Sequence, residues 1–204
     1  MEEYSNHSGG EYRLDKLGRL KITEDRARSY KRLSEATPGG IVPYLWREPG
    51  TDHGNLSIGI QMEHHKQSDR IDVICKNDSP DEISFKVFFV TERTSHVSAC
   101  FYSPADALVY FYEDDHIVLL NGHDRATISI MEQRNRKAVF EAMQGGTILP
   151  SPLARGYVIC ATMYHRILRP GEVSKLSNWT VSGKTKEEAM LLDYLVKKQT
   201  SIYH

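Results

Sequence analysis

The segment DRIDVICKNDSPDEISFKVFF, residues 69–89, decides the fold class of this 204-residue chain. Apolar side chains alternate with polar ones on both sides of a central Asn-Asp-Ser-Pro-Asp run, which has typical turn chemistry. Because successive side chains of a strand point to opposite faces, Ile71, Val73 and Cys75 fall on one face of the first strand. The pattern predicts two strands joined as an antiparallel hairpin, with one buried and one solvated face.

The same alternation recurs along much of the remaining chain. Further predicted strands cover residues 56–62, 107–112, 116–120, 127–132, 157–168 and 173–181. The acidic run at residues 113–115 separates two of these strands as a short turn, so we expect those two to pair as a hairpin. About nine to eleven closely spaced strands are typical of a sandwich. We therefore expect an all-β fold, a large two-sheet antiparallel supersandwich with a C-terminal amphipathic helix.

The helix is predicted from a change of pattern near the end of the chain. Thr185 and Glu188 form a capping box, in which a hydroxyl and a carboxylate satisfy free backbone amides at a helix start. Apolar residues then recur at intervals of three or four from Ala189 to Val196. We expect this helix to run from about residue 185 to about residue 199.

The chain is interpreted as a single domain in three parts. Residues 1–54 form an irregular N-terminal segment, residues 55–183 the β-sandwich, and residues 184–204 a linker-type helix. The first part is the least regular because Pro-Gly pairs interrupt it. It contains one candidate short hairpin, which would pair residues 11–14 with residues 19–23.

The composition argues against several classes of function. Lys and Arg number 26 and Asp and Glu 27, which gives a net charge of −1. A chain without a basic excess has no field to hold a phosphate backbone, so no nucleic-acid partner is expected. No apolar run approaches the roughly 20 residues that cross a bilayer, so no membrane contact is expected. The acidic start, Met1-Glu2-Glu3, is unlike a signal peptide, which indicates a cytoplasmic location.

The sequence indicates neither a metal site nor a cofactor. Cys75, Cys100 and Cys160 form no Cys-x-x-Cys pair. Each cysteine lies among apolar residues, so we expect three buried free thiols. The nine histidines do not show the spacing of metal ligands.

Three segments together resemble one protein family. They are residues 69–89, residues 107–122, and the run LRPGE at 168–172 followed by WTVSGKTKEEA at 179–189. In order and spacing they look like the paired strands, the next hairpin and the closing strand of one domain. That domain is the N-terminal β-supersandwich of bacterial glycoside hydrolase family 15, the glucoamylase-like enzymes. The resemblance extends over about residues 55–200.

The resemblance implies a carbohydrate-enzyme-related domain without catalysis. In that family the two catalytic glutamates lie in an (α/α)6 barrel that follows the sandwich, whereas this sequence ends at His204. No catalytic residue carries over, and the expected function is weak binding of a glycan such as an α-glucan, or binding of a partner protein. Because indole and phenol rings stack on sugar faces and anchor interfaces, the candidate contact residues are Trp46, Trp179, Tyr110 and Tyr112.

One alternative is a stand-alone sugar enzyme of sandwich fold, such as a mutarotase or an epimerase. That chemistry needs a general acid and a general base, typically His with Glu or Asp, on either side of a bound sugar. The candidates are His165, His116 and Glu113, with the sequence neighbours at 63–64 and 123–124 as further pairs. The sequence alone does not bring any two of these candidates together.

A second alternative is a protein-interaction module. Leu191, Tyr194 and Leu195 lie on the predicted C-terminal helix and are expected to be partly exposed. Uncovered apolar patches of this kind mark partner sites or dimer interfaces. The helix is therefore the candidate surface for a partner protein or for a homodimer.

Overall fold

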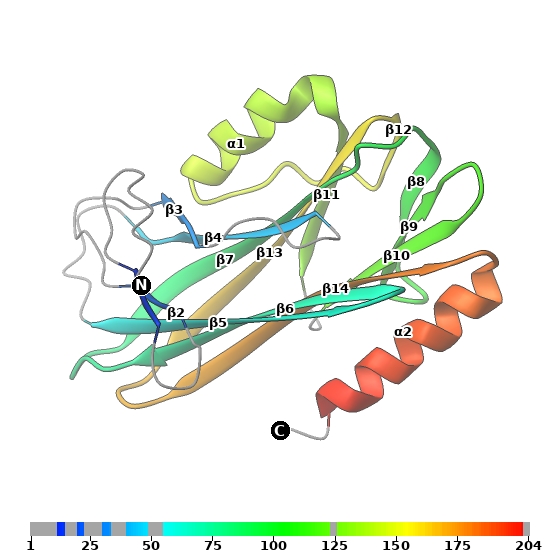
Figure 1. Cartoon of the computed structure of the whole chain (residues 1–204). Coiled ribbons are helices and arrows are strands. Elements are labelled where there is room, and N and C mark those ends of the chain that lie inside the picture. Colours follow the sequence, from blue (N-terminus) through cyan, green and yellow to red (C-terminus); the bar gives the residue numbers. More distant parts are fainter. Residues whose placement is uncertain are drawn as a thin grey trace, which may run out of the picture.

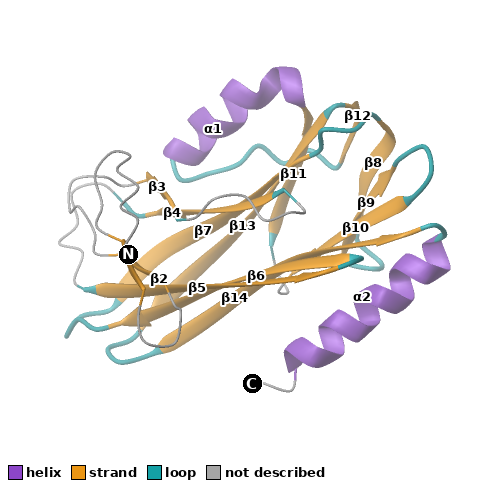
Figure 2. Ribbon diagram, in the orientation of Figure 1, coloured by secondary structure: helices purple, strands orange, loops and turns teal. Residues whose placement is uncertain are grey.

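The computed structural model describes residues 12–14, 20–22, 30–33, 40–48, 55–122 and 126–201. Two antiparallel sheets pack face to face, and one helix lies on the outer side of each sheet (Figures 1 and 2). The predicted all-β sandwich with a C-terminal helix is therefore confirmed.

The two sheets differ in size. The larger has seven strands in the order β12 (Leu153–Gly156), β8 (Val97–Ser103), β9 (Leu108–Tyr112), β10 (Ile117–Gly122), β14 (Val173–Gly183), β6 (Ser68–Asn77) and β5 (Leu56–His65). The smaller has five in the order β11 (Thr127–Glu132), β13 (Val158–Leu168), β7 (Ile83–Glu92), β4 (Ile41–Trp46) and β3 (Tyr30–Arg32). β1 (Tyr12–Leu14) and β2 (Leu20–Ile22) pair separately, as the hairpin expected near the N-terminus.

The segment 69–89 supplies two strands as predicted, but the predicted hairpin pairing is wrong. β6 pairs with β5 and β14 in the larger sheet, whereas β7 pairs with β13 and β4 in the smaller sheet. The connection is an arch that carries the chain from one sheet to the other. Alternation fixes which face of a strand is buried but not which strand lies beside it.

A second arch, residues 169–172, joins β13 to β14 and lies beside the first. The side-chain amide of Asn77, in the first arch, donates to the carbonyl of Leu168 at 2.9 Å. The backbone N–H of Asn77 donates to the carbonyl of Glu172 at 3.0 Å, and its carbonyl accepts from the N–H of Gly171 at 2.8 Å. Asn77 is fully buried, so this single residue ties the two arches together.

The space between the sheets is filled by apolar side chains from both of them. Ile71, Val73 and Cys75 are buried there, on the face that the alternation predicts. Cys100 and Cys160 join them, and none of the three buried cysteines is in a disulfide, as expected. Burial raises the pKa of Cys160 to about 12.

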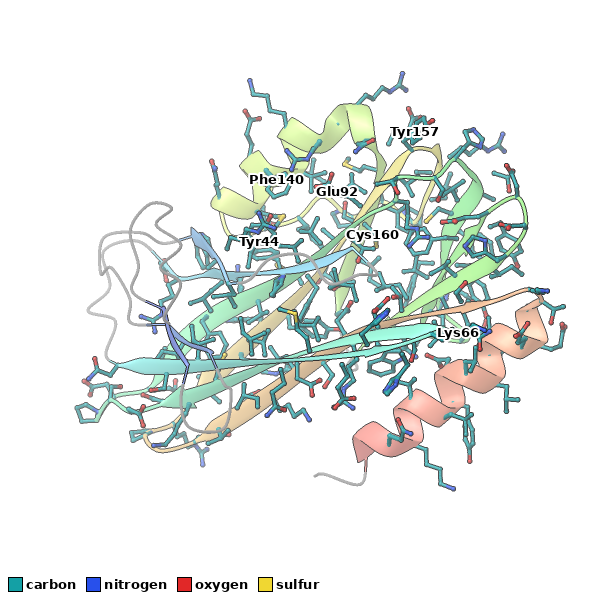
Figure 3. The ribbon with its side chains drawn as sticks, viewed as in Figure 1. Tyr44, Lys66, Glu92, Phe140, Tyr157 and Cys160 are labelled. Atoms are coloured by element: carbon teal, nitrogen blue, oxygen red, sulfur yellow. The ribbon has the colours of Figure 1, made fainter. Side chains whose placement is uncertain are left out.

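The outer face of the smaller sheet is covered by α1 (Arg136–Gln144), which follows a short 3-10 turn, η1 (Gln133–Asn135). Val139 and Met143 pack against Phe88 of the sheet. Phe140 meets the ring of Tyr44 edge-on, with 5.6 Å between the ring centroids (Figure 3). This helix is not predicted from the sequence, because nine residues give little more than two turns of periodicity.

β4 lies between β7 and β3 in the smaller sheet, although the sequence analysis leaves its residues in the irregular N-terminal segment. Its buried residues include the neighbours Tyr44 and Leu45, which point to opposite faces. A strand covered on both faces shows no alternation. Pro43 also lies in the middle of β4, and a proline inside a run of residues argues against predicting a central strand there.

The outer face of the larger sheet is covered by α2 (Lys186–Ser201). The N–H of Glu188 donates to the hydroxyl of Thr185 at 3.2 Å, and the Glu188 carboxylate accepts from the N–H of Lys184 at 2.8 Å. The capping box is therefore present. Ala189 and Leu192 of the helix pack against Trp179 of the sheet.

Candidate functional site

One cluster of titratable side chains lies at the turn between β9 and β10. Tyr112 and Ile117 are register partners, and the N–H of Glu113 donates to the carbonyl of His116 at 3.0 Å. This closed turn places both side chains on one side of the hairpin. The Nε2 atom of His116 lies 3.0 Å from Oε2 of Glu113. The structure thus brings together His116 and Glu113, two of the acid–base candidates of the enzyme alternative.

Arg93 fixes the Glu113 carboxylate from the other sheet. It directly follows β7, and its Nε and Nη2 atoms lie 2.7 Å and 2.6 Å from Oε1 of Glu113. The side chains of Glu113 and Arg93 are 3% and 16% exposed. The pair closes one end of the sandwich, and it leaves Oε2 of Glu113 to hold the His116 ring.

Asp115 completes the cluster on the solvent side. Its Oδ1 atom lies 2.5 Å from Nδ1 of His116, and its side chain is 88% exposed. The imidazole, 32% exposed, therefore has one buried carboxylate and one accessible carboxylate at its two nitrogens. The hydrogen bond and the charge of His116 lower the pKa of Asp115. If a ligand takes the place of Asp115 beside the ring, the Nδ1 atom of His116 can exchange a proton with that ligand.

A second cluster is aromatic and lies on the outer face of the same hairpin. Phe101, Tyr110 and Tyr112 form an offset stack, with ring centroids 5.3 Å to 6.3 Å apart and planes within 20° of parallel. Tyr110 is buried, and its hydroxyl donates to Asp106 at 2.9 Å. Phe101 is 37% exposed. Two predicted contact residues therefore meet here, next to an aromatic ring that the sequence analysis does not select.

The two tryptophans lie on different sheets, and Trp179 belongs to the same apolar cluster as Tyr110 and Tyr112. Trp179 is buried beneath α2, and its indole N–H donates to the carboxylate of Asp193 at 2.8 Å. Trp46 lies on the other sheet, where its indole N–H donates to the carbonyl of Gln144 at 3.0 Å. The Nζ atom of Lys86 lies 4.8 Å from the centroid of the Trp46 ring.

The remaining histidine candidates lie apart from His116. His165 is exposed on β13 of the smaller sheet, and its Nε2 atom lies 2.9 Å from the hydroxyl of Ser84. His64 contacts Asp69 on the neighbouring strand β6. The pair at 123–124 lies outside the described residues.

Two shallow surface grooves lie beside η1 and α1. One, of about 440 Å³, is lined by Glu132, Gln133, Arg134, Arg155, Gly156 and Tyr157. The other, of about 590 Å³, is lined by Arg134, Arg136, Lys137, Phe140, Glu141 and Gln144. Neither groove includes a predicted site residue.

Among the residues that the structure describes, no group of three or more His, Cys, Asp or Glu side chains is placed to hold a metal ion. No helix in the described ranges is long and apolar enough to span a membrane.

Comparisons with known proteins give a likeness of fold only. No family model matches the sequence, and no curated protein matches it. The chain is similar in structure to an Escherichia coli K12 protein called "Putative aldose 1-epimerase", with a TM-score of 0.41 and 5% sequence identity. The match covers 84% of this chain and 79% of that chain. It concerns the arrangement of strands and carries no argument about activity.

Proposed function

We propose that this chain is a sugar-directed acid–base catalyst that interconverts the two anomers of a free aldose. The proposal is supported by one observation: the accessible imidazole of His116 contacts one buried carboxylate and one exposed carboxylate. Glu113 is buried and fixed by Arg93, whereas Asp115 is exposed and can be displaced. The substrate class comes from the resemblance of the strand segments to the sandwich of carbohydrate enzymes.

Interconversion of anomers needs one proton removed and one proton added. A base takes the proton of the hydroxyl on C1 while the bond between C1 and the ring oxygen breaks, and an acid protonates the ring oxygen. The electrons of the O–H bond form the new C=O bond, and the electrons of the broken C–O bond stay on the ring oxygen. Rotation about the C1–C2 bond and the reverse transfers then close the ring as the other anomer.

The cluster supplies one group for each transfer. Asp115, the exposed carboxylate beside the His116 ring, is the base. The Nδ1–H of the His116 imidazolium is the acid. Glu113 accepts the hydrogen bond from Nε2–H, orients the ring and balances its charge, and Arg93 holds Glu113 in place. The sugar hydroxyl and ring oxygen, bonded to the same carbon, would insert between Asp115 and His116.

Polarimetry tests the proposal directly. Freshly dissolved α-D-glucose or α-D-galactose relaxes to its equilibrium rotation faster when catalysed, and we expect the purified protein to accelerate this relaxation. His116→Asn should remove at least nine-tenths of the acceleration. His165→Asn, which changes an exposed histidine on the other sheet, should retain it. If the wild-type protein leaves the spontaneous rate of both sugars unchanged, the proposal is wrong.

A second candidate function is glycan binding without catalysis at the aromatic stack. It is favoured by the accessible Phe101 ring beside Tyr112, because sugar faces stack on such rings. Titration with maltoheptaose, followed by NMR, should shift signals of Phe101 and Tyr112, and Phe101→Ala should abolish the shifts. Signals that do not move at millimolar maltoheptaose would exclude this function for α-glucans.

A further inference from the structure

Helix α2 carries two apolar stripes, and only one of them packs on the sandwich. Ala189, Leu192 and Val196 belong to the cluster that covers the larger sheet. The opposite stripe contains Leu191 and Tyr194, both 60% exposed, and Leu195, 47% exposed. Met190, 38% exposed, lies next to it. Figure 1 shows α2 at the periphery of the molecule, with the sheets on one side of it.

The exposed stripe is symmetric about its own centre. The midpoint lies between Leu192 and Asp193, and residues at equal distances from it match in kind. Leu191 corresponds to Tyr194, and Met190 corresponds to Leu195. The outermost matching pair has opposite charges, Glu187 in the first turn and Lys198 in the last.

We propose that two copies of this chain associate through α2, antiparallel, about a two-fold axis at this midpoint. In that arrangement Leu191 packs on Tyr194 of the second copy, and Glu187 meets Lys198 of the second copy at each end. A two-fold interface uses the same patch on both subunits, so a self-complementary stripe is what it requires. A parallel pairing would place like charges together and is disfavoured.

Met190 links the helix to the aromatic stack on the sheet, where Phe101 is partly exposed. The Tyr110 hydroxyl lies 4.0 Å from the sulfur of Met190, and the Tyr110 ring stacks on Phe101 at 5.3 Å. Phe101 is the register partner of Leu153 on the edge strand β12, and Leu153 is 64% exposed. A helix of 16 residues is about 24 Å long. The helix pair is therefore short, and the flanking sheet surface adds area toward the roughly 1,200 Å² of a specific interface.

Sedimentation velocity over a range from low micromolar to several hundred micromolar protein tests the proposal. We expect the wild-type chain to shift from monomer to dimer. Tyr194→Glu should raise the dissociation constant at least tenfold, because it places a carboxylate in the apolar centre. Ile167→Glu, at a similarly exposed apolar position on the other sheet, should leave the constant unchanged.

Charge reversal identifies the register. Glu187→Lys and Lys198→Glu should each weaken the dimer, and the double variant should restore it, because the pairs re-form with opposite signs. A chain that stays monomeric at all concentrations overturns the proposal, and so does a dimer that these variants do not affect. Sugar relaxation rates measured on the same variants should not change, so this test is independent of the proposed catalysis.

Discussion

Replacing Arg93 by leucine should destabilise the fold more than any exposed charge change. Arg93→Leu removes both hydrogen bonds to Oε1 of Glu113 and leaves a carboxylate that is 3% exposed without its cationic partner. Breaking a buried ion pair by removing one partner costs about 3–5 kcal/mol. His116 still contacts the other oxygen of Glu113, so we expect about 3 kcal/mol, at the lower end of that range. For a domain of this size the loss corresponds to about 6–12 °C in Tm.

Urea unfolding followed by circular dichroism measures this loss. The matched control is Arg134→Leu, which breaks a pair with Glu132 whose side chains are 78% and 42% exposed, and which should cost less than about 1 kcal/mol. The double variant Arg93→Leu with Glu113→Leu should recover part of the stability, because it leaves no unpaired buried charge. If Arg93→Leu costs no more than Arg134→Leu, the buried pair does not hold the two sheets together at this end.

Three further predictions concern other parts of the molecule. Asn77→Ala should lower the free energy of unfolding by about 3 kcal/mol, because it deletes the buried amide that donates to the carbonyls of Leu168 and Asp81. A loss under about 1 kcal/mol would contradict the role of Asn77 in joining the arches. The contact with His116 lowers the pKa of Asp115 in the folded protein. The stability that Asp115 contributes is therefore present above the pKa that it has in the unfolded chain, and it is lost as the pH falls through its lower pKa in the folded protein. The NMR titration midpoint of Asp115 should lie below the ordinary pKa of an aspartate and return toward it in His116→Asn, and an unchanged midpoint would show that the contact does not form. A thiol reagent should leave Cys160 unmodified in the native protein and react with it in urea, whereas rapid native labelling would contradict its burial.

The sequence predicts the faces of strands better than their neighbours. Ile71, Val73 and Cys75 point into the core as their alternation indicates, because burial depends on local pattern. The pairing of β6 and β7 was mispredicted because it depends on long-range contacts that a short segment does not contain. α1 is too short to show clear periodicity, and β4 is buried on both faces.

The candidate site likewise depends on long-range contacts that a short segment of sequence does not contain. Glu113 and His116 belong to one turn, but their contact was not predicted from the sequence and comes from the structure. Arg93 reaches them from the other sheet, and no local pattern marks it. Phe101 joins the two tyrosines only through the pairing of β8 with β9, which alternation does not specify. The contact with Asp115 depends on a rotamer rather than on sequence.

The two arches have a consequence for how this protein reaches its native state. Because the chain passes from one sheet to the other at Asn77 and again after Leu168, strands that are neighbours in space come from regions about ninety residues apart in the sequence. Neither sheet can be completed without bringing those distant regions together, and folds dominated by such non-local pairings form slowly. Cleavage between the arches should therefore yield two fragments that depend on each other, not two stable halves.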